Sequence, residues 1–98
     1  MYVRVWEYEV PRHRTGEFAA AYAVDGLWGE LFGRAVGYLG TELYRDSARP
    51  GRFLTIDRWR DERAWQAFLT DFRPDYETLD TRLEGIAAAE RSLFEGYS

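Results

Sequence analysis

Cysteine and lysine are both absent from this 98-residue chain, and histidine occurs only once. Without cysteine, disulfides, thiolate chemistry and cysteine-based metal sites are excluded, and one histidine cannot build a multi-histidine metal site within a subunit. The nearest candidate for a phosphate-binding loop, Gly33 to Gly40, lacks the GxGxxG spacing of dinucleotide-binding loops. These absences predict a protein that holds no metal and no flavin.

Long hydrophobic runs and basic clusters are missing as well. The longest apolar run, Phe18 to Val24, is far shorter than the roughly 20 residues that a membrane-spanning helix needs. The first ten residues carry Arg4 and Glu7 within a strand pattern, which differs from a signal peptide. All 13 basic residues are scattered arginines in a chain of net charge −4, so no basic stripe could follow a phosphate backbone. We therefore expect a cytoplasmic protein with no nucleic-acid or membrane partner.

Aromatic residues, in contrast, are abundant: they make up 17% of the chain, with four tryptophans, seven tyrosines and six phenylalanines. This is more than one small core needs, so we expect some of them to line a pocket or a subunit interface. The length predicts a single domain over residues 1–98. A domain of this size is only marginally stable, and dimerisation would stabilise it further.

The segment from Gly37 to Trp59 predicts two strands joined by the polar loop Asp46 to Gly51. Successive residues of a strand point to opposite faces, and here both faces carry large apolar groups. In the first strand, Leu39 and Leu43 belong to one face, and Tyr38 and Tyr44 belong to the other. In the second strand, Phe53 and Trp59 belong to one face, and Leu54 and Ile56 belong to the other. A sheet with one face in water would alternate apolar and polar residues. The pattern therefore predicts a sheet covered by helices on one face and by a second copy of the chain on the other, that is, a homodimer.

The remaining elements follow from periodicity and from helix start and stop signals. Expected are a strand at Tyr2–Val10, a helix at Arg14–Val24, a short helix capped by Asp25, a helix from Asp61 to Phe72, a helix from Pro74 to Gly85, and a strand from about Ala88. The order βαββαβ predicts an α+β fold of the ferredoxin-like type with an antiparallel sheet.

Four stretches carry a family likeness: VRVWEYEVP, DGLWGELFGRA, GYLGTELYRD and PGRFLTIDRWRDERAWQAFL. With them the chain resembles the antibiotic biosynthesis monooxygenase family, small ferredoxin-like proteins of the dimeric α/β-barrel superfamily. The resemblance implies a dimer whose sheets face each other, with a small pocket between sheet and helices in each subunit. Some members oxygenate aromatic substrates without metal or flavin, others bind and degrade haem, and a few isomerise small molecules.

The departures from the family pattern limit what the resemblance implies. Haem-degrading relatives carry an axial histidine on the helix that here spans Asp61 to Phe72, and this helix has none. They also have an asparagine in the first strand, where this chain has Trp6. The resemblance therefore implies no haem. Of the residues that polyketide-type oxygenases place in their site, Trp59 is retained, while Thr55 and Trp65 lie near the asparagine and tyrosine positions.

Two residues are candidates for catalysis. Asp57 shares a strand face with Thr55 and Trp59, and a carboxylate among aromatic walls would have a raised pKa, as a general base requires. A salt bridge from Asp57 to Arg4 or Arg58 is the alternative. His13 could titrate near neutral pH at a pocket mouth, or it could lie in an exposed loop.

The candidate substrate-binding residues are aromatic. They are Trp59, Trp6, Tyr8, Trp28 and Phe32. Each could instead be a core residue, because aromatic groups at strand or helix spacing are usually packed inside. Tyr44 and Tyr76 are further polar groups that could converge on the same pocket.

Two functions are compatible with these residues. The first is a cofactor-independent monooxygenase, an oxidoreductase acting on a small aromatic or quinone-like molecule. The second is a non-catalytic dimeric module that binds a small ligand in the same pocket. An enzyme needs a positioned base or oxyanion donor beside the aromatic wall, whereas a binding module needs only shape and apolar surface.

Overall fold

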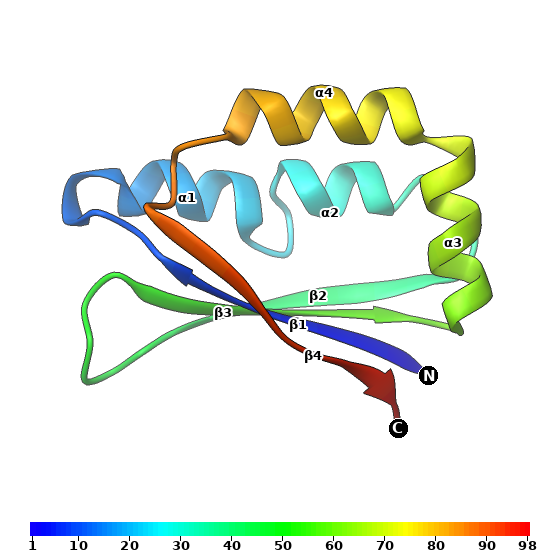
Figure 1. Ribbon diagram of the computed structural model, residues 1–98, viewed down its shortest axis with the longest axis horizontal. Helices are drawn as coiled ribbons and strands as arrows, with labels where there is room; N and C mark the ends of the chain where they lie inside the picture. Colours follow the sequence, from blue (N-terminus) through cyan, green and yellow to red (C-terminus); the bar gives the residue numbers. More distant parts are fainter.

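A computed structural model describes all residues, 1–98, as a four-stranded antiparallel sheet with the helices on one face (Figure 1). The elements are β1 (Tyr2–Glu9), a 3-10 turn η1 (Arg12–Arg14), α1 (Thr15–Tyr22), α2 (Leu27–Phe32), β2 (Tyr38–Arg45), β3 (Arg52–Trp59), α3 (Glu62–Asp71), α4 (Arg73–Leu83) and β4 (Ala89–Tyr97). The strand order is β2-β3-β1-β4, which confirms the ferredoxin-like α+β fold.

The register of the sheet decides which side chains face the helices. Across β1 and β3, Arg4 lies opposite Asp57 and Trp6 opposite Thr55. Residues directly opposite each other share a face, so these side chains point toward the helices together. The same face receives Thr41 of β2, which lies opposite Asp57. Three adjacent strands thus bring their polar groups to one point of the sheet.

An irregularity near the start of β2 changes the face of one side chain. The pairing shifts between Tyr38 and Gly40, so that Tyr38 lies opposite Trp59 while Thr41 lies opposite Asp57. Simple alternation would place Tyr38 and Thr41 on opposite faces. The extra residue of the bulge turns Tyr38 to the helix-facing side instead. Gly40 takes part with a φ of 143°, a conformation that favours glycine.

The starts of the first two helices differ from the prediction. The first helix begins at Thr15 because residues 12–14 form a 3-10 turn closed by the Arg14 amide on the Pro11 carbonyl at 2.9 Å. The second helix is capped by Gly26 and not by the Asp25 side chain. Gly26 is needed there, because a Cβ on it would lie 2.6 Å from the Ala21 carbonyl oxygen. The tight turn before the second helix therefore requires a glycine at position 26.

Other local predictions are confirmed. Asp61 caps α3, where its side chain accepts a hydrogen bond from the Ala64 amide at 2.8 Å. Pro74 lies in the first turn of α4, where its missing N–H costs nothing. Residues 46–51 form the connection between β2 and β3. None of the helices has the length and apolar character that crossing a bilayer requires.

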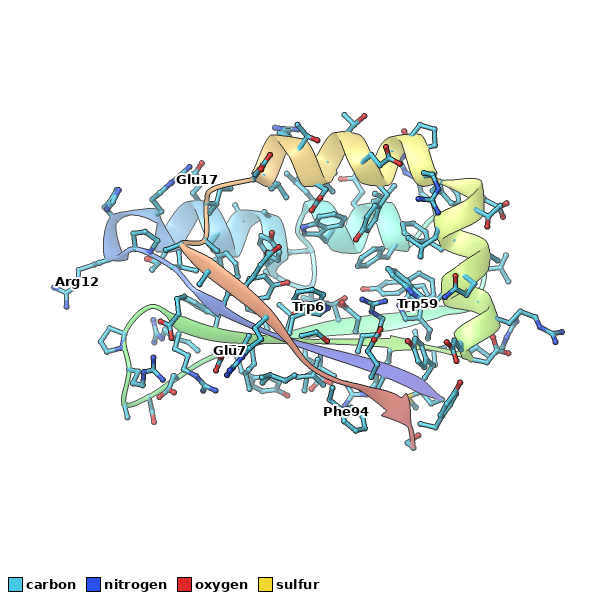
Figure 2. The ribbon with its side chains drawn as sticks, viewed as in Figure 1. Trp6, Glu7, Arg12, Glu17, Trp59 and Phe94 are labelled. Atoms are coloured by element: carbon cyan, nitrogen blue, oxygen red, sulfur yellow. The ribbon has the colours of Figure 1, made fainter.

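The core fills the space between helices and sheet, and the opposite face of the sheet is bare. Phe18, Trp59 and Phe68 are the largest fully buried side chains. Figure 2 shows Trp59 on the helix side and Phe94 on the far side of the sheet. Phe94 is 53% exposed and lies opposite Val5, which itself lies opposite Ile56. The bare face therefore carries an apolar row across three strands.

Candidate functional site

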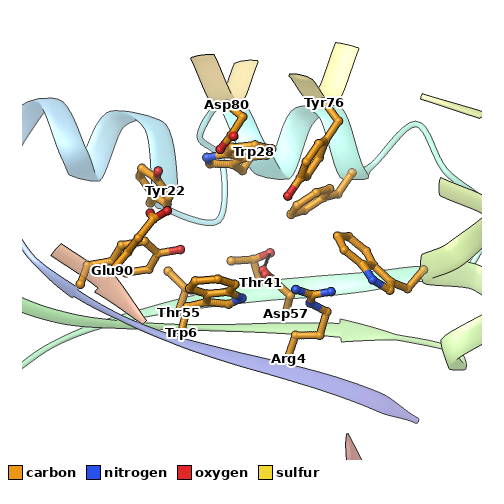
Figure 3. Close-up of a pocket in the computed structure, with 13 residues that line it drawn as sticks. Arg4, Trp6, Tyr22, Trp28, Thr41, Thr55, Asp57, Tyr76, Asp80 and Glu90 are labelled. Atoms are coloured by element: carbon orange, nitrogen blue, oxygen red, sulfur yellow. Dashed lines mark hydrogen bonds between the residues drawn. The ribbon is translucent and has the colours of Figure 1, made fainter. Parts of the chain in front are cut away.

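A pocket opens between the helix-facing side of the sheet and the helices above it (Figure 3). Its cavity volume is about 80 Å³, and it is partly open to solvent. The lining consists of Arg4, Trp6, Tyr8, Tyr22, Trp28, Phe32, Thr41, Thr55, Asp57, Trp65, Tyr76, Asp80 and Glu90. All four strands and all four α-helices contribute at least one of these residues, so the pocket depends on the complete fold.

Asp57 lies on the floor of the pocket, at the centre of the sheet. Its Oδ1 accepts a hydrogen bond of 2.7 Å from the Thr41 hydroxyl, and the Thr41 oxygen lies 2.5 Å from the Tyr38 hydroxyl. Because Thr41 has one proton and donates it to the carboxylate, Tyr38 must donate to Thr41. Burial raises the pKa of Asp57, and the Thr41 hydrogen bond and the charge of Arg4 oppose this only in part.

Arg4 stands beside Asp57 but is held by other partners. Its guanidinium carbon lies 3.9 Å from the centre of the Trp65 ring, and Nη1 lies 3.2 Å from Glu95 Oε1. The other predicted salt-bridge partner, Arg58, pairs with Glu42 on the far side of the sheet. Asp57 is thus hydrogen-bonded but has no ion pair, which differs from the salt-bridge alternative considered from the sequence.

The walls are aromatic and support one another. Trp28 packs against Phe32 with ring centres 5.5 Å apart, and against Tyr76 at 5.3 Å. Trp6 stacks on Tyr8 on the opposite wall. Interlocked rings of this kind lose little freedom when a ligand arrives, so the aromatic walls of the pocket are set in place in advance.

Two of the residues predicted for the site lie elsewhere. Trp59 has no exposed surface and packs against Phe32, Trp65 and two further rings in the core. Trp65 and Phe32 line the pocket, so they separate Trp59 from it. His13 is exposed on η1 and is not among the lining residues. Trp59 could therefore affect a bound ligand only indirectly, by supporting Phe32 and Trp65, which line the pocket.

The other predicted residues come together in the pocket. Trp6, Tyr8, Trp28, Phe32 and Asp57 all line it. Of the two additional tyrosines, Tyr76 lines the pocket, whereas Tyr44 is opposite Leu54 in the sheet and half exposed. This arrangement places one carboxylate with a raised pKa at the base of an aromatic slot.

Comparison with known proteins agrees with this geometry. The family model described as antibiotic biosynthesis monooxygenase matches residues 1–71. The chain belongs to the antibiotic biosynthesis monooxygenase family. No curated protein matches it at a significant level.

Solved structures of very different sequence share the fold of this family member. A variant of SnoaB, a cofactor-independent oxygenase from Streptomyces nogalater, superposes with a TM-score of 0.74 at 17% identity, covering 99% of this chain and 91% of that one. MupZ from Pseudomonas fluorescens gives 0.69 at 13% identity, covering 91% and 67%. A variant of MhuD with two manganese protoporphyrin IX molecules per active site gives 0.67 at 20% identity, covering 100% and 94%. At these identities the likeness establishes the fold alone.

The pocket of this family member does not fit a haem. None of its 13 lining side chains is histidine, cysteine or methionine, which are common ligands of haem iron. Tyrosine can also bind haem iron, but burial raises the pKa of all three lining tyrosines, Tyr22 to about 12. They are therefore neutral phenols at pH 7 rather than phenolate ligands. No group of three or more His, Cys, Asp or Glu side chains is placed to hold a metal ion.

Sequence reasoning missed several lining residues. Thr41 and Tyr22 were not among the predicted site residues, because their role depends on which elements pack above the sheet. Asp80 on α4 and Glu90 on β4 were not singled out from the sequence. The only available signal was helical spacing, because Asp80 lies four residues after Tyr76 and so on the same side of the helix.

Proposed function

We propose that this protein is a cofactor-independent monooxygenase that acts on a small aromatic or quinone-like molecule bound between sheet and helices. The observation that carries the proposal is Asp57, a carboxylate with a raised pKa on the floor of an aromatic pocket. A carboxylate whose pKa is raised is a stronger base than an ordinary aspartate, as proton removal from a substrate requires. The cofactor-independent oxygenase SnoaB shares the fold, which supports the assignment.

The proposed reaction can be written for anthrone, whose central ring contains a CH₂ group. Asp57 removes one proton, and the carbanion passes an electron to O₂, after which the two radicals combine to a peroxide on carbon. Asp57 returns its proton to the peroxide. Asp57 then removes the second C–H proton as the O–O bond breaks, and the leaving hydroxide recovers that proton. The products are one carbonyl group and one water, so CH₂ and O₂ balance as C=O and H₂O.

Other residues of the site stabilise this chemistry. Arg4 keeps N–H donors beyond those that face Glu95, and its positive charge lies next to Asp57. It can stabilise the substrate anion that forms once the proton has left. Thr41, oriented by Tyr38, holds Asp57 Oδ1 in place and leaves the second carboxylate oxygen for the substrate. The aromatic walls align a flat ring over the carboxylate.

Oxygen uptake with anthrones and quinols tests the proposal. Replacing Asp57 by asparagine keeps the shape and the Thr41 hydrogen bond but removes the base, so we expect uptake to fall by about 10²-fold or more. Asp71→Asn, the same chemical change at an exposed position on α3, is the matched control. Under ¹⁸O₂, one labelled oxygen should enter the product. Uptake that survives Asp57→Asn would contradict the role of Asp57.

Binding without catalysis is the second candidate. It is favoured by the predominance of aromatic walls and by the engagement of Asp57 Oδ1 with Thr41. Absence of oxygen uptake with every aromatic substrate, together with saturable binding of one of them, would establish this alternative.

We further propose that two copies form a homodimer through their bare sheet faces. The support is the apolar row of Val5, Ile56 and the 53% exposed Phe94. Light scattering at micromolar concentration should give a dimer. Phe94→Ser should dissociate it without unfolding the chain, while Val36→Ser, at a 79% exposed loop position away from that face, should not. A wild-type monomer would contradict the proposal.

A further inference from the structure

The charges that line the pocket are unbalanced. Asp57, Asp80 and Glu90 line it together with a single cationic side chain, Arg4. The structure contains ten ion pairs, and none of them involves these three carboxylates. Arg4 itself is paired with Glu95 outside the pocket lining. The chain has 13 arginines but leaves this cavity with a net negative lining.

Two of these carboxylates belong to the mouth of the pocket. Asp80 comes from α4 and Glu90 from β4, and Figure 3 shows both carboxylates near Trp28 and Tyr22, away from the floor where Asp57 lies. Burial raises the pKa of Glu90, and the charge of Asp80 raises it further. Both side chains are exposed at the edge of the pocket, where their like charges repel each other, and a cation between them would relieve that repulsion.

Trp28 gives a second and independent indication of a ligand site at the same place. Its side chain is buried except for 8% of its surface, and its indole N–H has no hydrogen-bond partner. Figure 3 shows this nitrogen on the side of Tyr22 and Asp80. A buried donor without a partner costs about 1–3 kcal/mol. An oxygen on a ligand would satisfy it, and the aromatic rings around it would favour a neighbouring cation.

These mouth residues are not part of what the family match implies. The match ends at residue 71, whereas Tyr76, Asp80 and Glu90 all come later in the chain. The family match therefore carries no information about the acidic mouth, whereas most of the floor and wall residues lie within the matched region.

From these observations we propose that the ligand of this pocket is an oxygen-bearing aromatic molecule with a protonated amino group. The ring lies between the aromatic walls with its acidic hydrogen at Asp57, and the ammonium group lies at the mouth between Asp80 and Glu90. This inference rests on the proposed function, because it names the class of molecule that the same pocket would take. It narrows the small aromatic molecule of the proposed function to one that carries a positive charge.

Three phenols of nearly equal size test the charge requirement. They are tyramine, which carries an ammonium group, tyrosol, which carries a neutral hydroxyl, and 4-hydroxyphenylacetate, which carries a carboxylate. In calorimetric titrations we expect tyramine to bind about tenfold more tightly than tyrosol, which corresponds to about 1.4 kcal/mol. The carboxylate should bind more weakly than both. The preference for tyramine should shrink as salt is added, because the mouth is partly open.

Variants locate the preference on the mouth. In Glu90→Gln and in Asp80→Asn, the ratio of tyramine affinity to tyrosol affinity should fall several-fold toward one. Asp75→Asn removes the same charge from an exposed position on α4 outside the pocket, and it should leave the ratio unchanged. In spectra of the four indole N–H groups, tyramine should shift the resonance that is lost in Trp28→Phe, because its ammonium group would lie beside that indole.

The outcomes separate this inference from the proposed function. If tyrosol binds as tightly as tyramine, the cation requirement is refuted while an aromatic pocket remains. If the preference for tyramine survives both mouth variants, the cation lies elsewhere and the proposal is also refuted. If none of the three phenols binds, the aromatic-ligand function itself fails. None of these titrations depends on oxygen uptake.

Discussion

Trp59 provides the sharpest test of where the core ends and the pocket begins. It has no exposed surface, and its ring centre lies 5.2 to 5.5 Å from those of Phe32, Tyr38, Trp65 and Phe68. Trp59→Ala would open a cavity among these four rings. Substitutions of this kind cost about 3–5 kcal/mol, a large share of the roughly 5–15 kcal/mol that stabilises a typical domain.

The expected loss can be measured in two ways. Urea unfolding followed by circular dichroism gives the free energy directly, and calorimetry gives the melting temperature. At about 4–8 °C per kcal/mol for a domain of this size, the melting temperature should fall by on the order of 12 °C or more. Trp59→Phe should cost much less, because it retains most of the ring and removes an indole N–H that has no partner.

Ligand binding supplies the contrasting measurement. A Trp59→Phe variant that stays folded should bind phenols much as the wild type does, because Phe32 and Trp65 stand between residue 59 and the pocket. Trp6, a half-buried lining residue, should show the reverse when changed to alanine, with a smaller loss of stability and a larger loss of binding. The reasoning would be refuted if Trp59→Ala kept its melting temperature but lost ligand binding.

Three further predictions concern single residues. Burial raises the pKa of Asp57 above its unfolded value, so the wild type loses stability as pH rises through the folded pKa. Asp57→Asn should therefore be more stable than the wild type at pH 7. In urea titrations, this difference in the free energy of unfolding should vanish near pH 3.5. Asp61→Ala removes the cap of α3 and should cost about 1 kcal/mol in urea unfolding, with Arg63→Ala in the exposed first turn as a control. Gly37→Ala should cost about 1–3 kcal/mol, since φ is 93° and the new Cβ would lie 2.6 Å from the Ala64 Cβ; an unchanged melting temperature would contradict the strain.

Local patterns were sufficient to predict the strand order and the main turns. Runs of strand-forming residues identified β2 and β3, although neither run alternates cleanly, and the polar run at residues 46–51 identified the turn between them. Asp61 was predictable as a helix cap because capping depends on a hydrogen bond three residues away. These features are decided within a few residues of the chain, where the sequence is directly informative.

The site was less predictable because it depends on distant packing. Alternation placed Asp57 and Trp59 on one face correctly, but it could not show that α3 covers Trp59 and leaves Asp57 open to the pocket. The hydrogen bond between Tyr38 and Thr41 depends on a bulge that breaks alternation. Asp80 and Glu90 meet the same pocket only after two elements from the end of the chain have docked.

The pairing of β1 with β4 has a consequence for how the protein folds. These strands lie at opposite ends of the sequence, and Tyr8 is opposite Glu90 in the sheet. Contacts between such distant segments slow folding, because a long loop must close before the pairing stabilises it. The hairpin of β2 and β3 can form early, whereas the carboxylate of Glu90 reaches the pocket only with this late pairing. The capacity to hold a ligand would thus mature after the bulk of the aromatic core has already collapsed.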